Sequence, residues 1–235
     1  MHDALDELLT AGFKSDAPVG PSRMKLYGYF RSSAAYRVRI ALNLKGIPVE
    51  HAFIHLRRNE QSTADYKAMN PLELIPTLDH DGLFLTQSLA IIEYLEEIQP
   101  DPRLLPESAA DRAYVRALAF SIACDIHPLN NLRVLKYLTQ QLGVQDAGRE
   151  AWFAHWISVG LGALEQVLGR ETRVGVYCCG DRLSLAEVCL VPQVYSAERM
   201  KCDLSDMPII TRIVAAARRH PAFEAAAPEA QGDAE

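Results

Sequence analysis

The spacing of apolar residues changes early in the chain, and the change predicts a strand followed by a helix. Leu26, Gly28 and Phe30 alternate with the residues between them, which favours a strand. Apolar residues then recur at helical spacing from Val38 onward, and Gly46 is a suitable end for that helix. The pattern therefore places a strand-to-helix junction just after Phe30.

The pattern up to about residue 100 continues in short elements. Asp81-Gly82 suits the positive φ angles of a two-residue hairpin turn and separates two short apolar runs. The order is βαβ, then a hairpin, then a helix, which predicts an α/β unit. The elements expected after the first helix are a strand at 49–56, a short helix at 61–68 that Asn70-Pro71 ends, strands at 77–79 and 83–86, and a helix that begins at Gln87-Ser88 with Leu89, Ile92 and Leu95 on one face.

Helical spacing dominates after a proline-bearing linker at 100–106, which predicts a second, all-helical unit. Ser184 and Glu187 have capping-box spacing at the start of one of its helices, and we expect them to be structural. The last ten residues are expected to fray. The helices expected are 111–124, 128–141, 149–168, 185–199 and 208–219, the last stopped by His220-Pro221.

Composition restricts the classes of function. The chain has 235 residues, 49% of them hydrophobic, and a net charge of −6, so it offers no general attraction to nucleic acid or to anionic membranes. No apolar run reaches the ~18 residues that indicate a membrane span. Five cysteines without metal-ligand spacing or a secretory signal indicate reduced thiols, no metal site and a cytoplasmic protein. Residues 1–23 are expected to be a mobile extension, or the natural start is Met24.

Ser32 and Ser33 lie where the first helix begins. The first turn of a helix presents unpaired N–H groups and a partial positive charge, so a hydroxyl there can help to hold an anion or a thiolate. Serine is also a preferred N-cap, and for an arbitrary helix an ordinary cap is the favoured explanation. The two readings stay open on this evidence alone.

Four longer runs of sequence together resemble the zeta class of cytosolic glutathione S-transferases, the maleylacetoacetate isomerases. The resemblance extends from Met24 to about Ala226. It implies an α/β plus all-α architecture: a thioredoxin-like, glutathione-binding domain at 24–103 and a helical substrate domain at 109–225, followed by a tail at 226–235, in a homodimer. The runs are residues 32–42 (SSAAYRVRIAL), 70–78 (NPLELIPTL), 87–95 (QSLAIIEYL) and 125–135 (DIHPLNNLRVL).

The resemblance also implies which residues form the site. Glutathione would be the cofactor and its sulfur the nucleophile, with Ser33 and Ser32 as catalytic residues and Pro76 held cis. Arg31, His127, Arg133 and Arg199 would bind a small dicarboxylate substrate. The implied glutathione contacts are Ser32, Ser33, Ala34, Arg37, Gln61, Ile75, Pro76, Gln87, Ser88, His127 and Asn131.

The implied reaction is cis-trans isomerisation of maleylacetoacetate to fumarylacetoacetate, in the catabolism of aromatic amino acids, by thiolate addition, bond rotation and elimination. Maleylpyruvate isomerisation, general glutathione transfer and non-catalytic glutathione binding remain alternatives. Dithiol redox catalysis would need a cysteine at the first junction, and residues 31–37 contain none. Ala34 departs from the family pattern, since many zeta-class proteins have cysteine there, so the reactive sulfur would have to come from glutathione.

Overall fold

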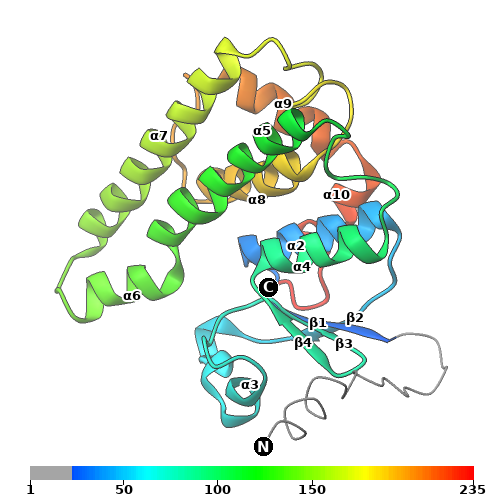
Figure 1. The fold of residues 1–235 in the computed structure, drawn as a ribbon. Helices are drawn as coiled ribbons and strands as arrows, with labels where there is room; N and C mark the ends of the chain where they lie inside the picture. The colour runs from blue at the N-terminus through cyan, green and yellow to red at the C-terminus, as the bar shows by residue number, and fades with distance from the viewer. Residues whose placement is uncertain (1–22) are drawn as a thin grey trace, which may run out of the picture.

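The computed structural model describes residues 23–235 of the chain. The expectations for the first 22 residues, that they form a mobile extension or precede the natural start, lie outside the described residues. The described chain contains a mixed four-stranded sheet followed by a helical region (Figure 1). None of the helices described is long and apolar enough to cross a membrane.

The sheet has the strand order β2-β1-β3-β4. Strand β1 (Met24–Gly28) pairs in parallel with β2 (Glu50–Phe53) and antiparallel with β3 (Thr77–His80), which in turn pairs antiparallel with β4 (Leu83–Thr86). The predicted hairpin is confirmed: Asp81 and Gly82 have φ angles of 51° and 90°. Helices α2 (Ser33–Lys45) and α4 (Ser88–Ile98) pack side by side between the sheet and the helical region (Figure 1).

The segment between β2 and β3 differs from the prediction. The strand expected over 49–56 covers only 50–53, because the chain turns into two 3-10 turns, Leu56–Arg58 and Glu60–Ser62, with Asn59 at a φ of 58° between them. The helix expected over 61–68 is α3 (Ala64–Met69), which begins later because the Thr63 side chain caps it. Local hydrogen bonds of polar side chains to the backbone compete here with strand and helix.

The helical region follows the expected order with two corrections. The helix expected over 111–124 is α-helical only as far as Phe120 and continues as a π-helix. The helix expected over 128–141 begins at Leu132, because Pro128 lies in a 3-10 turn. Pro221 does not only stop a helix but also starts another, since proline suits the first helical position. The bounds are α5 (Ala109–Phe120), the π-helix Ser121–Ile126, the 3-10 turn His127–Asn130, α6 (Leu132–Gln140), α7 (Asp146–Arg170), α8 (Leu185–Arg199), α9 (Pro208–Arg218) and α10 (Pro221–Ala226).

One apolar core joins the sheet to the helices. Leu26 of β1 and Val38 of α2 belong to the same cluster of buried residues as Val191 of α8 and Phe223 of α10. Helix α2 packs directly against α8 and α10, on the side away from the sheet. The junction before α2 therefore lies where the sheet meets the helical region.

The prediction that the chain end frays is wrong. After α10 the chain forms a 3-10 turn, Pro228–Ala230, and then runs back along the first half of the molecule. The Gln231 side-chain amide donates to the carbonyls of Ala225 and Ala227, and the Asp233 carboxylate accepts from the backbone N–H of Phe30. The sequence of residues 228–235 is short and acidic and has no apolar periodicity, so it did not predict these side-chain hydrogen bonds.

The predicted capping box at the start of α8 is confirmed. Glu187 is fully buried, and its carboxylate accepts from the Ser184 N–H, the Ser184 hydroxyl and the Cys178 N–H, each at 2.8 Å. These bonds tie the loop before α8 to the helix start, because Cys178 lies in the middle of that loop and Ser184 at its end.

Glu187→Ala is expected to destabilise the fold by at least about 2 kcal/mol, because an unsatisfied buried donor costs about 1–3 kcal/mol and several would be created. Denaturant unfolding followed by circular dichroism measures this change. The matched control is Glu198→Ala, which removes an exposed ion pair with Arg218 and should cost less than about 1 kcal/mol. Equal losses for the two variants would contradict a structural role for the capping box.

Candidate active site

The strand-to-helix junction places two serines in different environments. The Ser32 side chain is the N-cap of α2 and accepts from the Ala35 N–H at 3.2 Å. Ser33 is the first helical residue; it is buried, and its hydroxyl donates to the Pro192 carbonyl at 3.4 Å. That bond is long and therefore weak. The Ser33 hydroxyl can thus exchange this carbonyl for a stronger acceptor at little cost.

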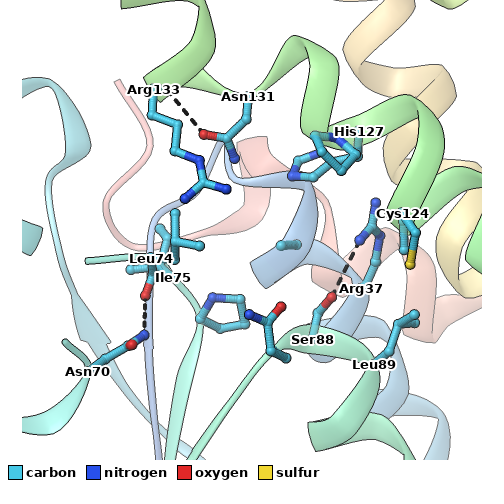
Figure 2. Close-up of a pocket in the computed structure, with 15 residues that line it drawn as sticks. Arg37, Asn70, Leu74, Ile75, Ser88, Leu89, Cys124, His127, Asn131 and Arg133 are labelled. Carbon is cyan, nitrogen blue, oxygen red and sulfur yellow. Dashed lines mark hydrogen bonds between the residues drawn. The ribbon is translucent and has the colours of Figure 1, made fainter. Parts of the chain in front are cut away.

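Two adjoining cavities open beside this junction. The smaller cavity, of about 180 Å³, lies between the loop before β3 and the starts of α4 and the 127–131 segment (Figure 2). The larger cavity, of about 450 Å³, lies between the junction, the 3-10 turns and helices α6 and α8. Leu74, Ile75, His127, Asn131 and Arg133 line both cavities. A ligand that extends from one to the other would pass the junction.

The wall beside β3 is fixed by buried hydrogen bonds. The Ile75-Pro76 peptide is cis, as predicted. Just before it, the Leu74 carbonyl accepts from the Asn70 side-chain amide and from the Tyr66 hydroxyl, both at 2.7 Å (Figure 2 shows the first). These bonds hold the backbone at the cavity edge in one conformation.

The floor of the smaller cavity is the N-terminus of α4. Gln87 precedes the helix with a φ of 68° and has no side-chain cap bond, and Ser88 is buried as its first residue. The N-terminus of a helix favours an anion, because its first N–H groups have no partner within the helix. The Ser88 hydroxyl accepts from the Arg37 guanidinium at 3.3 Å, which leaves its own proton available to a ligand (Figure 2).

Arg37 is a buried cation with unused donors. Its side chain is only 2% exposed, and among the described residues Nε and Nη2 have no hydrogen-bond partner. Burial lowers the pKa of Arg37 from its ordinary value. Buried charges are normally paired, so the site is electrostatically incomplete without an anion. Arg37 lines the smaller cavity and lies behind Ser88, which makes a carboxylate the fitting ligand.

His127 lies between the two cavities as a neutral group. Burial, and to a smaller extent the nearby Arg37 guanidinium, lowers the pKa of His127 to about 3. A lowered pKa means that the ring stays uncharged at every pH well above 3, so His127 offers hydrogen bonds but no positive charge near pH 7.

The ring resonances of His127 are therefore expected not to titrate between pH 5 and pH 8. Two-dimensional NMR of protein with labelled histidine measures this directly, and His220, which lies at the start of α10 outside both cavities, provides a reference signal. A midpoint near 6.5 for His127 would show that the ring becomes charged and would contradict the neutral assignment.

Arginines surround the larger cavity. Arg31, Arg57 and Arg199 line it, and within residues 23–235 none of the three forms an ion pair with a carboxylate. Burial lowers the pKa of Arg199, and the positive charges of Arg31 and Arg57 lower it further, so the three lie within each other's field. Such a group is suited to a ligand with more than one negative charge.

All the residues predicted for the site line one cavity or both. Arg57 was missed, because its position depends on the 3-10 turns that the apolar pattern did not reveal. Gln61, expected at glutathione, lines only the larger of the two cavities, where its Oε1 is buried with no hydrogen-bond partner among residues 23–235. The smaller cavity contains Ala34, Arg37, Ile75, Pro76, Gln87, Ser88, His127, Asn131 and Arg133, and the larger contains Arg31, Ser32, Ser33, Gln61, Ile75, His127, Asn131, Arg133 and Arg199.

Cysteines and metal ligands are scattered over the described part of the chain. All five cysteines are free thiols, and of these Cys124 is exposed at the edge of the smaller cavity. No group of three or more His, Cys, Asp or Glu side chains within residues 23–235 is arranged to hold a metal ion. The chemistry that the cavities support is therefore anion binding, hydrogen bonding and stabilisation of negative charge by arginine.

Comparisons with known proteins agree with this geometry. The family described as glutathione S-transferase, N-terminal domain, matches residues 22–97. A protein of Vibrio cholerae serotype O1 named "Probable maleylacetoacetate isomerase" is 56% identical over 89% of this chain and 97% of its own length.

Two solved structures extend the likeness to the fold. One, described as the holo structure of maleyl pyruvate isomerase, a bacterial glutathione S-transferase in zeta class, has a TM-score of 0.88 at 47% identity and covers 90% of this chain and 100% of its own. The other is maleylacetoacetate isomerase from Anaeromyxobacter dehalogenans 2CP-1 with bound dicarboxyethyl glutathione and citrate, with a TM-score of 0.81 at 38% identity over 91% of this chain and 98% of its own. With this identity over nearly all of the described residues, the chain belongs to the glutathione S-transferase family and, within it, to the zeta class.

Proposed function

We propose that this protein is a glutathione-dependent isomerase that converts maleylacetoacetate to fumarylacetoacetate. The proposal rests on the three arginines of the larger cavity, Arg31, Arg57 and Arg199, which form no ion pair within the described part of the chain. This cavity also contains Ser33 and adjoins the carboxylate site at Ser88. The 56% identity to the Vibrio cholerae protein supports the choice of substrate. Glutathione and a dicarboxylate would occupy adjoining cavities and meet at the junction.

The smaller cavity fits glutathione. The positive charge of Arg37, together with Ser88 and the helix N-terminus, suits the α-carboxylate of its γ-glutamyl group. The backbone at Ile75, which directly precedes the cis Pro76 and β3 and is held by the Asn70 hydrogen bond to the Leu74 carbonyl, suits the peptide part. The thiol would then lie at Ser33, where the two cavities adjoin.

When bound, glutathione would supply the thiolate for addition to the activated cis double bond, and its later elimination would return the tripeptide unchanged. Ser33 would donate a hydrogen bond from its hydroxyl to the thiolate sulfur, and the N-terminus of α2 would add its partial positive charge. Arg31 and Arg199 would hold the substrate carboxylates and stabilise the charge that develops on the carbonyl oxygen. His127 would donate a hydrogen bond as a neutral ring, because its pKa is about 3.

The substrate comparison tests this proposal. Purified protein is supplied with glutathione and either maleylacetoacetate or maleylpyruvate, and the loss of each cis acid is followed by absorbance. We expect a higher kcat/KM for maleylacetoacetate, and a loss of at least about tenfold in Arg199→Gln, which corresponds to about 1.4 kcal/mol in the transition state.

Two outcomes would replace the proposal. A clear preference for maleylpyruvate would make this chain a maleylpyruvate isomerase, the second candidate, which the 47% identity to the maleyl pyruvate isomerase structure supports. Binding of glutathione by calorimetry without turnover of either acid would make it a non-catalytic binding protein.

We also propose that the protein is a cytoplasmic homodimer with domains at 24–103 and 109–225, as the zeta-class likeness implies. Sedimentation equilibrium tests whether the protein is a dimer. A mass near twice that of the 26.1 kDa chain is expected, and a monomer at micromolar concentration would contradict the proposal.

A further inference from the structure

The last eight residues, Pro228–Glu235, form a strap that crosses from the helical region to the loops of the first half of the chain. Three of its carboxylates bind three different elements: Asp233 accepts from the Phe30 N–H at 3.0 Å, Glu235 contacts the His55 ring at 2.7 Å, and Glu229 accepts from the Tyr195 hydroxyl at 2.6 Å. Each of these partners lies close in sequence to an arginine of the larger cavity.

The first contact fixes the backbone just before Arg31. The Phe30 N–H is held by Asp233, and the Phe30 carbonyl accepts from the Arg39 guanidinium at 3.0 Å. The same buried guanidinium donates to the Ala226 carbonyl at 3.0 Å, which is the point where the strap leaves α10. Strap and junction are therefore parts of one hydrogen-bond network, and Arg31 extends from its edge over the Phe30 ring, 4.6 Å from the ring centre.

The second contact fixes the 3-10 turn that carries Arg57. Nδ1 of His55 accepts from the Arg58 N–H at 3.3 Å, so Nε2 bears the proton and donates it to Glu235. This bond, with the charges of Arg57 and Arg58, lowers the pKa of Glu235. His55 also packs against Tyr29, with ring centres 5.2 Å apart, which connects this turn to the junction.

The third contact lies on α8. Tyr195 precedes Arg199 by one helical turn, so its ring and the arginine lie on the same face of the helix. The Tyr195 ring is held from the other side by Tyr36 of α2 in an edge-to-face contact with centres 6.1 Å apart. Glu229 therefore holds Tyr195, which lies one helical turn before Arg199 on α8.

We propose that Asp233, Glu235 and Glu229 are positioning residues that hold Arg31, Arg57 and Arg199 around the larger cavity and so set its affinity for a dicarboxylate. No strap carboxylate forms an ion pair with any of these arginines in the described chain; the three carboxylates bind an N–H, a histidine and a hydroxyl group instead. The strap therefore places the arginines without neutralising them. The inference rests on the proposed function for the identity of the substrate only, since any dicarboxylate reports on the site.

The test uses the full-length protein and malonate as the probe, so that binding is measured without turnover. Calorimetric titration with malonate, in the presence of saturating glutathione, is expected to show an affinity at least fivefold weaker in Asp233→Ala than in the wild type, while the affinity for glutathione changes less than twofold. Asp233→Asn keeps an oxygen acceptor for the Phe30 N–H and should restore most of the malonate affinity. Glu224→Ala, which removes an exposed carboxylate from the adjacent α10, is the matched control and should bind as the wild type does.

Three results would overturn the inference: unchanged malonate affinity in Asp233→Ala, an equal loss for malonate and glutathione, or failure of Asp233→Asn to restore binding. The last result would show that the negative charge matters rather than the position of the junction. If Asp233→Ala does not fold, Glu229→Gln and removal of Glu235 supply the same comparison at the other two contacts. A wild-type protein that binds malonate but isomerises nothing would contradict the proposed function and leave the strap test intact.

Discussion

Replacing Ser33 by alanine is expected to lower kcat/KM for the isomerisation about a hundredfold while the fold is kept. The free thiol has a pKa of about 8.5, and lowering it by about two units takes ~2.7 kcal/mol of preferential binding of the thiolate. Ser33 is the hydroxyl at the junction whose present bond, 3.4 Å to Pro192, is weak enough to be given up. Steady-state kinetics and the ultraviolet absorbance of bound thiolate against pH measure the loss of rate and the rise of the thiol pKa together.

Ser32→Ala is the matched control, because the two serines are neighbours with different bonds. The Ser32 oxygen caps α2, so its removal should cost about 1 kcal/mol of stability and shift the thiol pKa less than Ser33→Ala does. An unchanged thiol pKa in Ser33→Ala would remove Ser33 from the catalytic role. An equal effect of both variants on the pKa would transfer that role to the helix N-terminus as a whole.

Arg37→Met is expected to weaken glutathione binding at least thirtyfold without destabilising the free protein. At an effective dielectric of about 20, a cation and a carboxylate roughly 6 Å apart attract by ~3 kcal/mol, and the ligand carboxylate would lose this attraction. The free protein would lose the 3.3 Å hydrogen bond from Arg37 to Ser88, and with it the desolvation cost of a buried cation whose Nε and Nη2 have no partner among the described residues. Apolar replacement of buried charge is often neutral or stabilising. Calorimetric titration with glutathione and thermal unfolding without ligand measure the two effects.

Arg39→Met supplies the contrast within the same helix. The Arg39 guanidinium donates to the carbonyls of Tyr29, Phe30 and Ala226, so its replacement should destabilise the fold by several kcal/mol. The Arg37→Met variant should also raise the pKa of His127, because the Arg37 charge contributes to the lowering of that pKa. Unchanged glutathione affinity in Arg37→Met would show that Arg37 does not take part in binding the glutathione carboxylate.

The sequence predicted those parts of the site that depend on local rules. The Asp81-Gly82 turn and the Ser184–Glu187 cap are decided by bonds within a few residues, and both occur as expected. The residues at 32–33 and 87–88 lie at helix starts, which apolar spacing and capping chemistry locate well. The family resemblance then indicated that both helix starts bind a ligand, which the capping pattern alone does not predict.

The features that the sequence did not predict depend on contacts between distant parts of the chain. Arg37 has the sequence position of a ligand contact, but its burial behind Ser88 follows from how α2 packs against α4. Arg57 faces the larger cavity only because the 53–63 segment folds into tight turns. The strap has no apolar period, and its partners Phe30 and His55 lie 203 and 180 residues away. Such bonds cannot be read from local spacing.

The core shared by α2, α8 and α10 has a consequence for ligand exchange. A hinge motion that swings the sheet away from the helices would expose Val38, Val191 and Phe223 to water, and burying each such side chain is worth about 1.5–3 kcal/mol. Rotation of whole domains is therefore too costly to admit a substrate on each turnover. Ligand exchange is therefore expected at the larger cavity itself, beside the 3-10 turn that carries Arg57.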